Sequence, residues 1–212
     1  MTLLEVFVQR WDLLKVAFID HMFLVFVAMA FATVISVSLG IILSSARKFA
    51  EFIIGITAVL QTIPSLALLG FMIPLVGIGK TNAIIALTAY ALLPILRNTY
   101  TGIVEVDSAA VEAGKGMGMT RGQILRKIEL PLALPIIMAG IRTATVITIG
   151  VATLATFVGA GGLGDLIMRG IQMQNTNLIL VGAIPAALLA LSSDFILKRI
   201  EKAATPQGLK KT

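Results

Sequence analysis

The residues most suggestive of chemistry form a glycine run late in the chain, Gly159-Ala160-Gly161-Gly162-Leu163-Gly164. Three of its glycines spell G-x-G-x-x-G, the pattern of a loop that cradles the phosphates of a dinucleotide. That chemistry needs a strand before the loop, a helix after it and an acidic residue about 20 residues further on. What the run does therefore depends on the elements that hold it.

The rest of the sequence offers little catalytic chemistry. Cysteine is absent, which excludes thiol nucleophiles and thiolate metal sites, and His21 is the single histidine. No Walker-type phosphate-binding sequence occurs. We expect no catalytic residue, no metal site and no cofactor bound by this chain, and hence no enzyme activity of its own.

The composition indicates a chain surrounded by lipid. Of its 212 residues, 58% are hydrophobic and 13% are charged, whereas a soluble globular domain carries about 25% charged residues. Crossing a bilayer takes about 20 apolar residues. We predict an all-α integral membrane protein with about five transmembrane helices, at 21–44, 52–76, 81–104, 132–158 and 175–197.

The distribution of Lys and Arg predicts the orientation. Thirteen of the seventeen lie in segments that five spans place on the C-terminal side, and cytoplasmic loops are enriched in these residues. We therefore expect the C-terminus, with a basic tail at 198–212, in the cytoplasm and the N-terminus outside the cell membrane. The same bias explains the formal charge of +6 without a nucleic-acid partner.

Residues 1–20 are expected to form one amphipathic helix on the outer membrane surface, leading into the first span. Its apolar face comprises Leu4, Val8, Trp11, Leu14 and Phe18. Tryptophan is enriched at membrane interfaces, which suits Trp11. His21, where the first span begins, is expected at the same interface.

The segment between the third and fourth spans is the one cytoplasmic loop long enough to carry an activity. Asp107 is a candidate cap for a first short helix, which Gly118 would help to end. Thr120 and Gln123 form a capping box for a second helix, and Pro131 stops that helix or opens the next span. An apolar contact face is expected from Met117, Met119, Ile124, Leu125 and Ile128. Alternatively, the loop only links two spans.

This loop resembles the EAA loop of ABC-importer permeases, in which Gly114 stands where alanine is usual. The resemblance implies the type I ABC importer permease fold and a cytoplasmic coupling helix, within 107–131, that docks on a separate ATPase subunit. That partner would bind ATP and Mg. Small side chains in the loop would allow close approach, and Glu112 would pair with a basic residue of the ATPase. The residues assigned to ATPase coupling are Glu112, Ala113, Gly114, Gly118, Thr120, Ile128, Leu130 and Pro131.

Three further stretches are similar to permeases of glycine betaine, carnitine and choline importers: 61–70, 90–99 and the glycine run. The resemblance implies an extracytoplasmic substrate-binding protein that selects the solute. Because five spans are few to enclose a path, we expect a second permease copy or a similar chain. Methionine-importer permeases share the glycine run, so an amino-acid importer is the alternative, with an ion-coupled secondary transporter third. Secondary transporters usually carry ionisable residues at membrane depth, whereas Arg97, Arg142 and Asp194 are expected near the ends of the spans here.

Candidates for the translocation path or its gates are polar, aromatic, proline and glycine residues: Gln61, Thr62, Pro64, Ser65, Tyr90, Thr145, Thr148, Thr156, Gly161 and Gly162. Polar residues in a span line a pathway or hydrogen-bond another helix, and the sequence leaves both roles open. The three threonines are expected to share one face of the fourth span. Tyr90 offers a cation–π contact to a quaternary ammonium, or a structural role.

The predicted topology argues against nucleotide binding by the glycine run. It ends the fourth span rather than a strand, and it falls outside, away from cytoplasmic nucleotides. We expect a break there, after which the chain re-enters as a short helix from Leu163 to about Met173, because glycine permits tight turns and close backbone approach. The run would then shape an outer gate or the surface beneath the binding protein.

Overall fold

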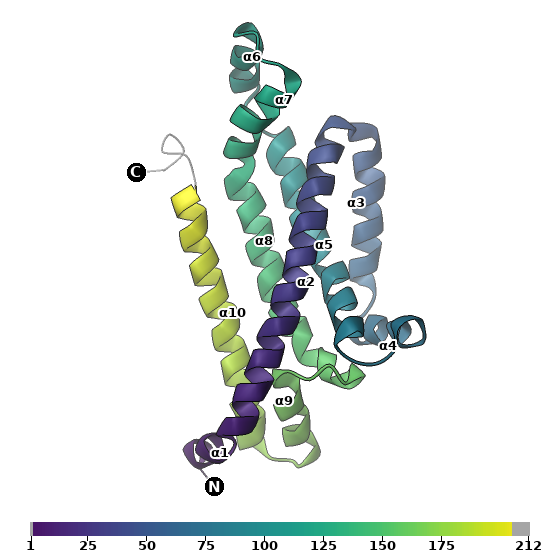
Figure 1. Ribbon diagram of the computed structural model, residues 1–212, viewed down its shortest axis with the longest axis vertical. Coiled ribbons are helices and arrows are strands. Elements are labelled where there is room, and N and C mark those ends of the chain that lie inside the picture. The colour runs from purple at the N-terminus through teal and green to yellow at the C-terminus, as the bar shows by residue number, and fades with distance from the viewer. Residues whose placement is uncertain (1, 205–212) are drawn as a thin grey trace.

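The computed structural model describes residues 2–204, and every regular element in that range is a helix (Figure 1). Four helices are long and apolar enough to cross a membrane: Trp11–Ser45 (α2), Lys80–Val104 (α5), the continuous stretch Arg121–Val158 and Thr176–Ala204 (α10). A bent pair, Arg47–Thr62 (α3) and Ser65–Val76 (α4), raises the number to five if it counts as one span. The all-α membrane fold class is thereby confirmed.

The core lies where α2, α5 and α8 (Leu130–Ala152) cross. Glycines bring the helix backbones together there, as is common in membranes. A Cβ atom built on Gly40 of α2 would lie 2.6 Å from Thr99 Cγ2 of α5, and one on Gly140 of α8 would lie 2.8 Å from the Pro94 carbonyl oxygen of α5. Large apolar side chains such as Phe26 and Leu191 remain exposed on the outside, as expected of surfaces that face lipid.

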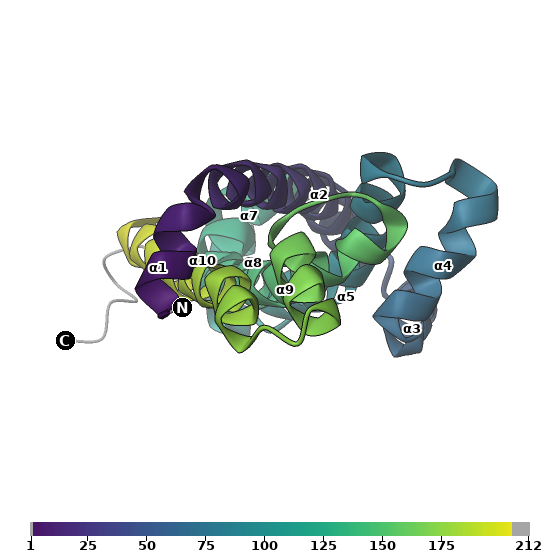
Figure 2. The same cartoon turned by 90° about the horizontal axis from the view of Figure 1, so that it is seen from below.

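The expected second span, 52–76, is not one straight helix. It bends by 99° between α3 and α4, because a proline disfavours the helical conformation in the residue before it. Ile63 accordingly has an extended backbone, with φ −65° and ψ 127°. Seen from below in Figure 2, α3 and α4 lie at the edge of the bundle away from α1 and α10.

The N-terminal segment differs from the single helix expected over 1–20. It forms α1 (Leu3–Gln9), and α2 starts at Trp11 after a break at Arg10. Val6 and Leu14 turn inward, whereas Leu4 and Val8 are exposed, so the predicted apolar face is divided between two helices. The change of direction at Arg10 is what removes the regular spacing.

The two ends of the bundle carry different structures. Ser108–Gly116 (α6) and Arg121–Ile124 (α7) project from one end, whereas α1, α4 and Leu163–Gln172 (α9) lie at the other (Figure 1). The part of the expected tail over 198–204 is a continuation of α10; the rest of that expectation falls on residues 205–212, outside the described residues.

Candidate functional site

The loop between α5 and α8 has the caps that its sequence predicts. The Asp107 side chain accepts a hydrogen bond from the Ala109 N–H at 2.9 Å and starts α6. Thr120 and Gln123 make the reciprocal capping box at the start of α7. Between the two helices Gly118 has φ +75°, a conformation that favours glycine. Local capping therefore fixes where both helices begin.

The second short helix is not separate, however. From α7 the chain continues through a π-helical turn, Leu125–Glu129 (η1), directly into α8. Pro131 follows this turn at the start of α8, and because the helix is continuous its missing N–H removes one intrahelical hydrogen bond at the π-helical turn. The bond between Arg121 Nη1 and Glu129 Oε1, 2.9 Å long, holds α7 against the base of α8. The second half of the loop, α7 and η1, is thus an extension of a spanning helix.

The predicted apolar contact face is wrong, because most of its residues pack the loop against itself. Ile124 is 2% exposed, and Met119, Leu125 and Ile128 are half-buried. Among the expected contact residues Met117 alone is largely exposed, at 72%.

Gly114 also differs from its expected role in close approach to a partner. It is buried, and a Cβ atom on it would lie 2.6 Å from Ile128 Cδ1, so its small size serves packing within the loop. Glu112 and Ala113 are exposed on the outside of α6, while Leu130 and Pro131 are half-buried at the start of α8. The surface offered to a partner is therefore carried mainly by α6.

The glycine run lies at the opposite end, between α2 and α9. It follows a helix, as expected, because α8 passes into a 3₁₀ turn, Thr153–Val158 (η2), before Gly159. Gly159, Gly161 and Gly162 all have positive φ. A Cβ atom on Gly162 would lie 3.2 Å from the His21 Nδ1 atom of α2. The chain then turns into α9, close to the expected Leu163–Met173.

His21 is buried rather than interfacial. Its side chain is 0% exposed, and Nε2 lies 3.2 Å from the Ile149 carbonyl oxygen of α8. The residue just before it, Asp20, forms an ion pair with Lys80 at 2.6 Å. Sequence reasoning missed both contacts, since each joins segments far apart in the chain. Together they hold the start of α5 and the glycine run against α2.

The candidates near Pro64 gather at the bend between α3 and α4. Gln61 Nε2 lies 3.5 Å from the Tyr90 carbonyl oxygen, and Thr62 bonds to the Val59 carbonyl oxygen of its own helix at 2.7 Å. Thr62 and Pro64 are exposed, and Ser65 is half-buried. Tyr90 is 7% exposed and its hydroxyl donates to the Ile63 carbonyl oxygen. Tyr90 thus supports the bend in this chain.

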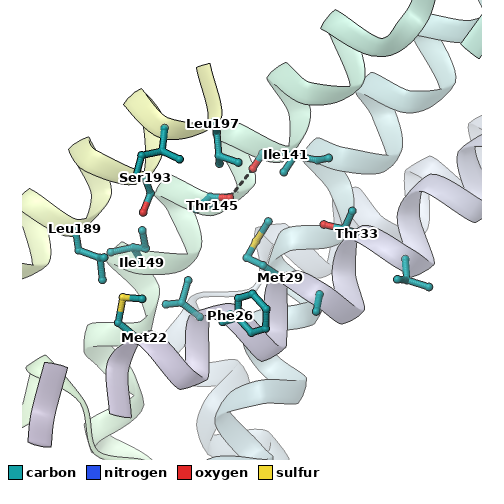
Figure 3. Close-up of a pocket in the computed structure, with 14 residues that line it drawn as sticks. Met22, Phe26, Met29, Thr33, Ile141, Thr145, Ile149, Leu189, Ser193 and Leu197 are labelled. Carbon is teal, nitrogen blue, oxygen red and sulfur yellow. Dashed lines mark hydrogen bonds between the residues drawn. The ribbon is translucent and has the colours of Figure 1, made fainter. Parts of the chain in front are cut away.

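The three threonines of the fourth span do not share one face. Thr145 lines a groove and bonds to the Ile141 carbonyl oxygen (Figure 3). Thr148 is fully buried, with its hydroxyl 3.5 Å from the Met29 sulfur. Thr156 donates to Asp165 of α9. The prediction fails for Thr156, because the helix changes to a 3₁₀ turn at Thr153 and the spacing of the side chains changes there. Thr145 and Thr148 lie on regular α8, and both are near Met29 of α2.

A charged cluster joins α8 to α10, which the sequence did not suggest. Arg142 bonds to Asp194 at 2.9 Å and to Glu201 at 2.8 Å. Asp194 and Glu201 are seven residues apart on α10, a spacing that places them on one face of a helix. That spacing is the only signal in the sequence that could have indicated the cluster.

Replacing Arg142 with Gln should destabilise the protein, because two neighbouring carboxylates lose the cation between them. Since Asp194 is 40% exposed at its side chain, we expect a moderate loss in the free energy of unfolding, about 1.5–3 kcal/mol. Thermal unfolding in detergent, followed by circular dichroism, measures it. Adding Asp194→Asn and Glu201→Gln to the same chain should restore much of the loss; no recovery would contradict an electrostatic role.

Comparison with known proteins agrees with this architecture. The chain is 48% identical over 190 residues to the glycine betaine/carnitine/choline transport system permease protein OpuCB of Bacillus subtilis (strain 168), covering 90% of this chain and 88% of that protein. It is 43% identical to the osmoprotectant import permease protein OsmW of Salmonella typhimurium, over 90% and 91% of the two chains. A solved structure of the MetNI methionine ABC transporter, in an inward-facing conformation, superposes with a TM-score of 0.84 at 28% identity, covering 93% of this chain and 99% of that one. The family model for the binding-protein-dependent transport system inner membrane component matches residues 17–206, and the chain belongs to that family.

Proposed function

We propose that this chain is the membrane permease of an ATP-driven importer of osmoprotectants such as glycine betaine, carnitine or choline. The observation that carries the proposal is the capped loop at one end of the helix bundle, where Glu112 lies exposed at the start of the EAA-like sequence. A separate ATPase binds this loop, and the bundle alternates between outward and inward access. ATP and Mg belong to the ATPase.

Two further partners follow from the same proposal. The bundle has four or five spans, which is few to surround a solute, so a second copy or a similar permease completes the path. A substrate-binding protein delivers the solute at the end that carries α9 and the glycine run. This arrangement puts the N-terminus outside and the C-terminus in the cytoplasm, in agreement with the Lys and Arg distribution.

The degree of similarity favours osmoprotectants over methionine as the substrate. Relatives named for betaine, carnitine or choline transport are 46–50% identical to the chain, compared with 28% for the methionine transporter structure. Within this proposal the candidates around Pro64, together with Gly161 and Gly162, belong to the path or its gates. Tyr90, held in its own hydrogen bond, positions the bend rather than a cation.

Reconstitution in liposomes with the cognate ATPase and binding protein tests the proposal. We expect ATP-dependent uptake of labelled glycine betaine, carnitine or choline, with an excess of unlabelled methionine having no effect. Uptake that needs no ATPase but collapses with an ion gradient would overturn it. Uptake of methionine in place of the quaternary amines would support the assignment as an ATP-driven importer but would contradict osmoprotectants as its substrates.

A further inference from the structure

Two apolar grooves join along the seam between α2 and α10. The first, of about 500 Å³, is lined by α2, α8 and α10, including Met22, Phe26 and Leu189 (Figure 3). The second, of about 600 Å³, is lined from α1, α2 and α10 and also includes Leu189. Leu189 lines both, so the two grooves meet at this residue on the same side of the bundle, and we call the pair the seam groove.

The seam groove lies at membrane depth. On α10 its lining extends from Ile184 to Leu197, which is about 20 Å of helix, within a hydrocarbon layer about 30 Å thick. The hydroxyls of Thr145 and Ser192 in its wall bond to carbonyl oxygens of their own helices, at 2.8 and 3.0 Å. Thr33 and Ser193 also line the groove, and the rest of its wall is mostly apolar, which suits lipid chains.

One end of the seam groove carries groups suited to a lipid headgroup. Trp11 and Lys15 line that end, and the Lys15 ammonium lies 5.9 Å from the centre of the Trp11 ring. Lysine commonly buries its methylene stem and extends its charge to the interface. Lys15 is paired with Asp12, whose side chain is 94% exposed, and such an exposed pair contributes little. A phosphate can therefore replace Asp12 as the partner of Lys15.

We propose that the seam groove is a phospholipid-binding site, with one acyl chain along α10 and the phosphate at Lys15. The charge of Lys15 fits an anionic phosphate, and the apolar wall beyond it fits the chain. A second permease copy is the other occupant to consider, but Lys15 and Trp11 at the end of the groove match the charge and amphipathic character of a lipid headgroup region. The bound lipid fills the space where α2 and α10 diverge from the α1 end (Figure 1) and so couples α2 to α10.

The position of the single tryptophan in the groove wall provides the test. The full chain in detergent is titrated with phosphatidylglycerol carrying brominated acyl chains, which quench tryptophan fluorescence at short range. We expect saturable quenching near one lipid per chain. Lys15→Gln should weaken the apparent affinity about fivefold, as expected for one lysine at a lipid surface. A brominated detergent without phosphate should give no saturation and no dependence on Lys15.

Ser192→Phe fills the groove and should abolish the saturable quenching. Leu191→Phe is the matched control, since Leu191 is the exposed neighbour that does not line the groove. Circular dichroism checks that both variants are helical. Equal quenching in both variants, or equal saturation by the phosphate-free detergent, would overturn the proposal. The proposal would also be overturned if the lipid gave no saturable quenching and Ser192→Phe dissociated a permease dimer.

Discussion

Replacing Gly164 with alanine should abolish transport, although the change adds a single methyl group. A Cβ atom at this position would overlap the Thr153 carbonyl oxygen and lie 2.8 Å from the Thr153 carbonyl carbon. Both atoms belong to backbone, so no side-chain rotation relieves the clash, and α9 must move away from η2. Overpacking of this kind costs about 1–3 kcal/mol or more, which corresponds to a shift of about 5- to 150-fold between two conformations.

Uptake of labelled glycine betaine by cells that lack their own importers measures the effect, with the amount of permease in the membrane determined in parallel. The matched control is Gly150→Ala on α8, because a Cβ atom on Gly150 meets nothing within 4 Å. We expect uptake to fall at least about tenfold for Gly164→Ala and to stay unchanged for Gly150→Ala. Normal uptake by Gly164→Ala would mean that α9 does not need its contact with η2.

The last glycine of the run is thus required for packing rather than for phosphate binding. The sequence could predict that the run ends a spanning helix and precedes a short one, because both follow from apolar length and glycine conformation. It could not predict that Gly164 faces the Thr153 carbonyl oxygen or that Gly162 faces His21. Those contacts depend on how α9 packs against η2 and how the glycine run packs against α2, which no local pattern encodes.

The loop between α5 and α8 likewise has features that could be predicted and features that could not. Its caps at Asp107 and Thr120 could be predicted, because each is a contact between residues two or three positions apart. The burial of its apolar residues could not be predicted. Ile124 and Ile128 pack beneath Gly114, which belongs to a different helix, and the helical spacing within one segment gives no information about such a contact. The sequence therefore places Gly114 on a partner surface, whereas in the structure Gly114 is part of the loop's interior.

These corrections leave Glu112 as the exposed acidic residue of the EAA-like sequence, because Glu129 is buried. Replacing it with alanine should uncouple transport, because the ATPase loses the carboxylate that pairs with its basic residue. Truncating one member of a charge pair at an interface costs about 2–5 kcal/mol, so binding of the ATPase should weaken about 30-fold or more. The permease itself should fold normally, since Glu112 is exposed in the isolated chain.

Glu105→Ala is the matched control for this change. Glu105 is also exposed and follows directly after α5, close in sequence to the loop but outside the EAA-like residues. We expect co-purification with the ATPase and ATP-dependent uptake to be lost together in Glu112→Ala and kept in Glu105→Ala. If both variants keep the ATPase, α6 does not dock through Glu112; if both lose it, the ATPase responds to negative charge at this end of the bundle in general. If Glu112→Ala alone loses ATPase binding and uptake, the contact belongs to α6. This helix carries the exposed surface of the loop, because Gly114 and Ile124 lie inside it.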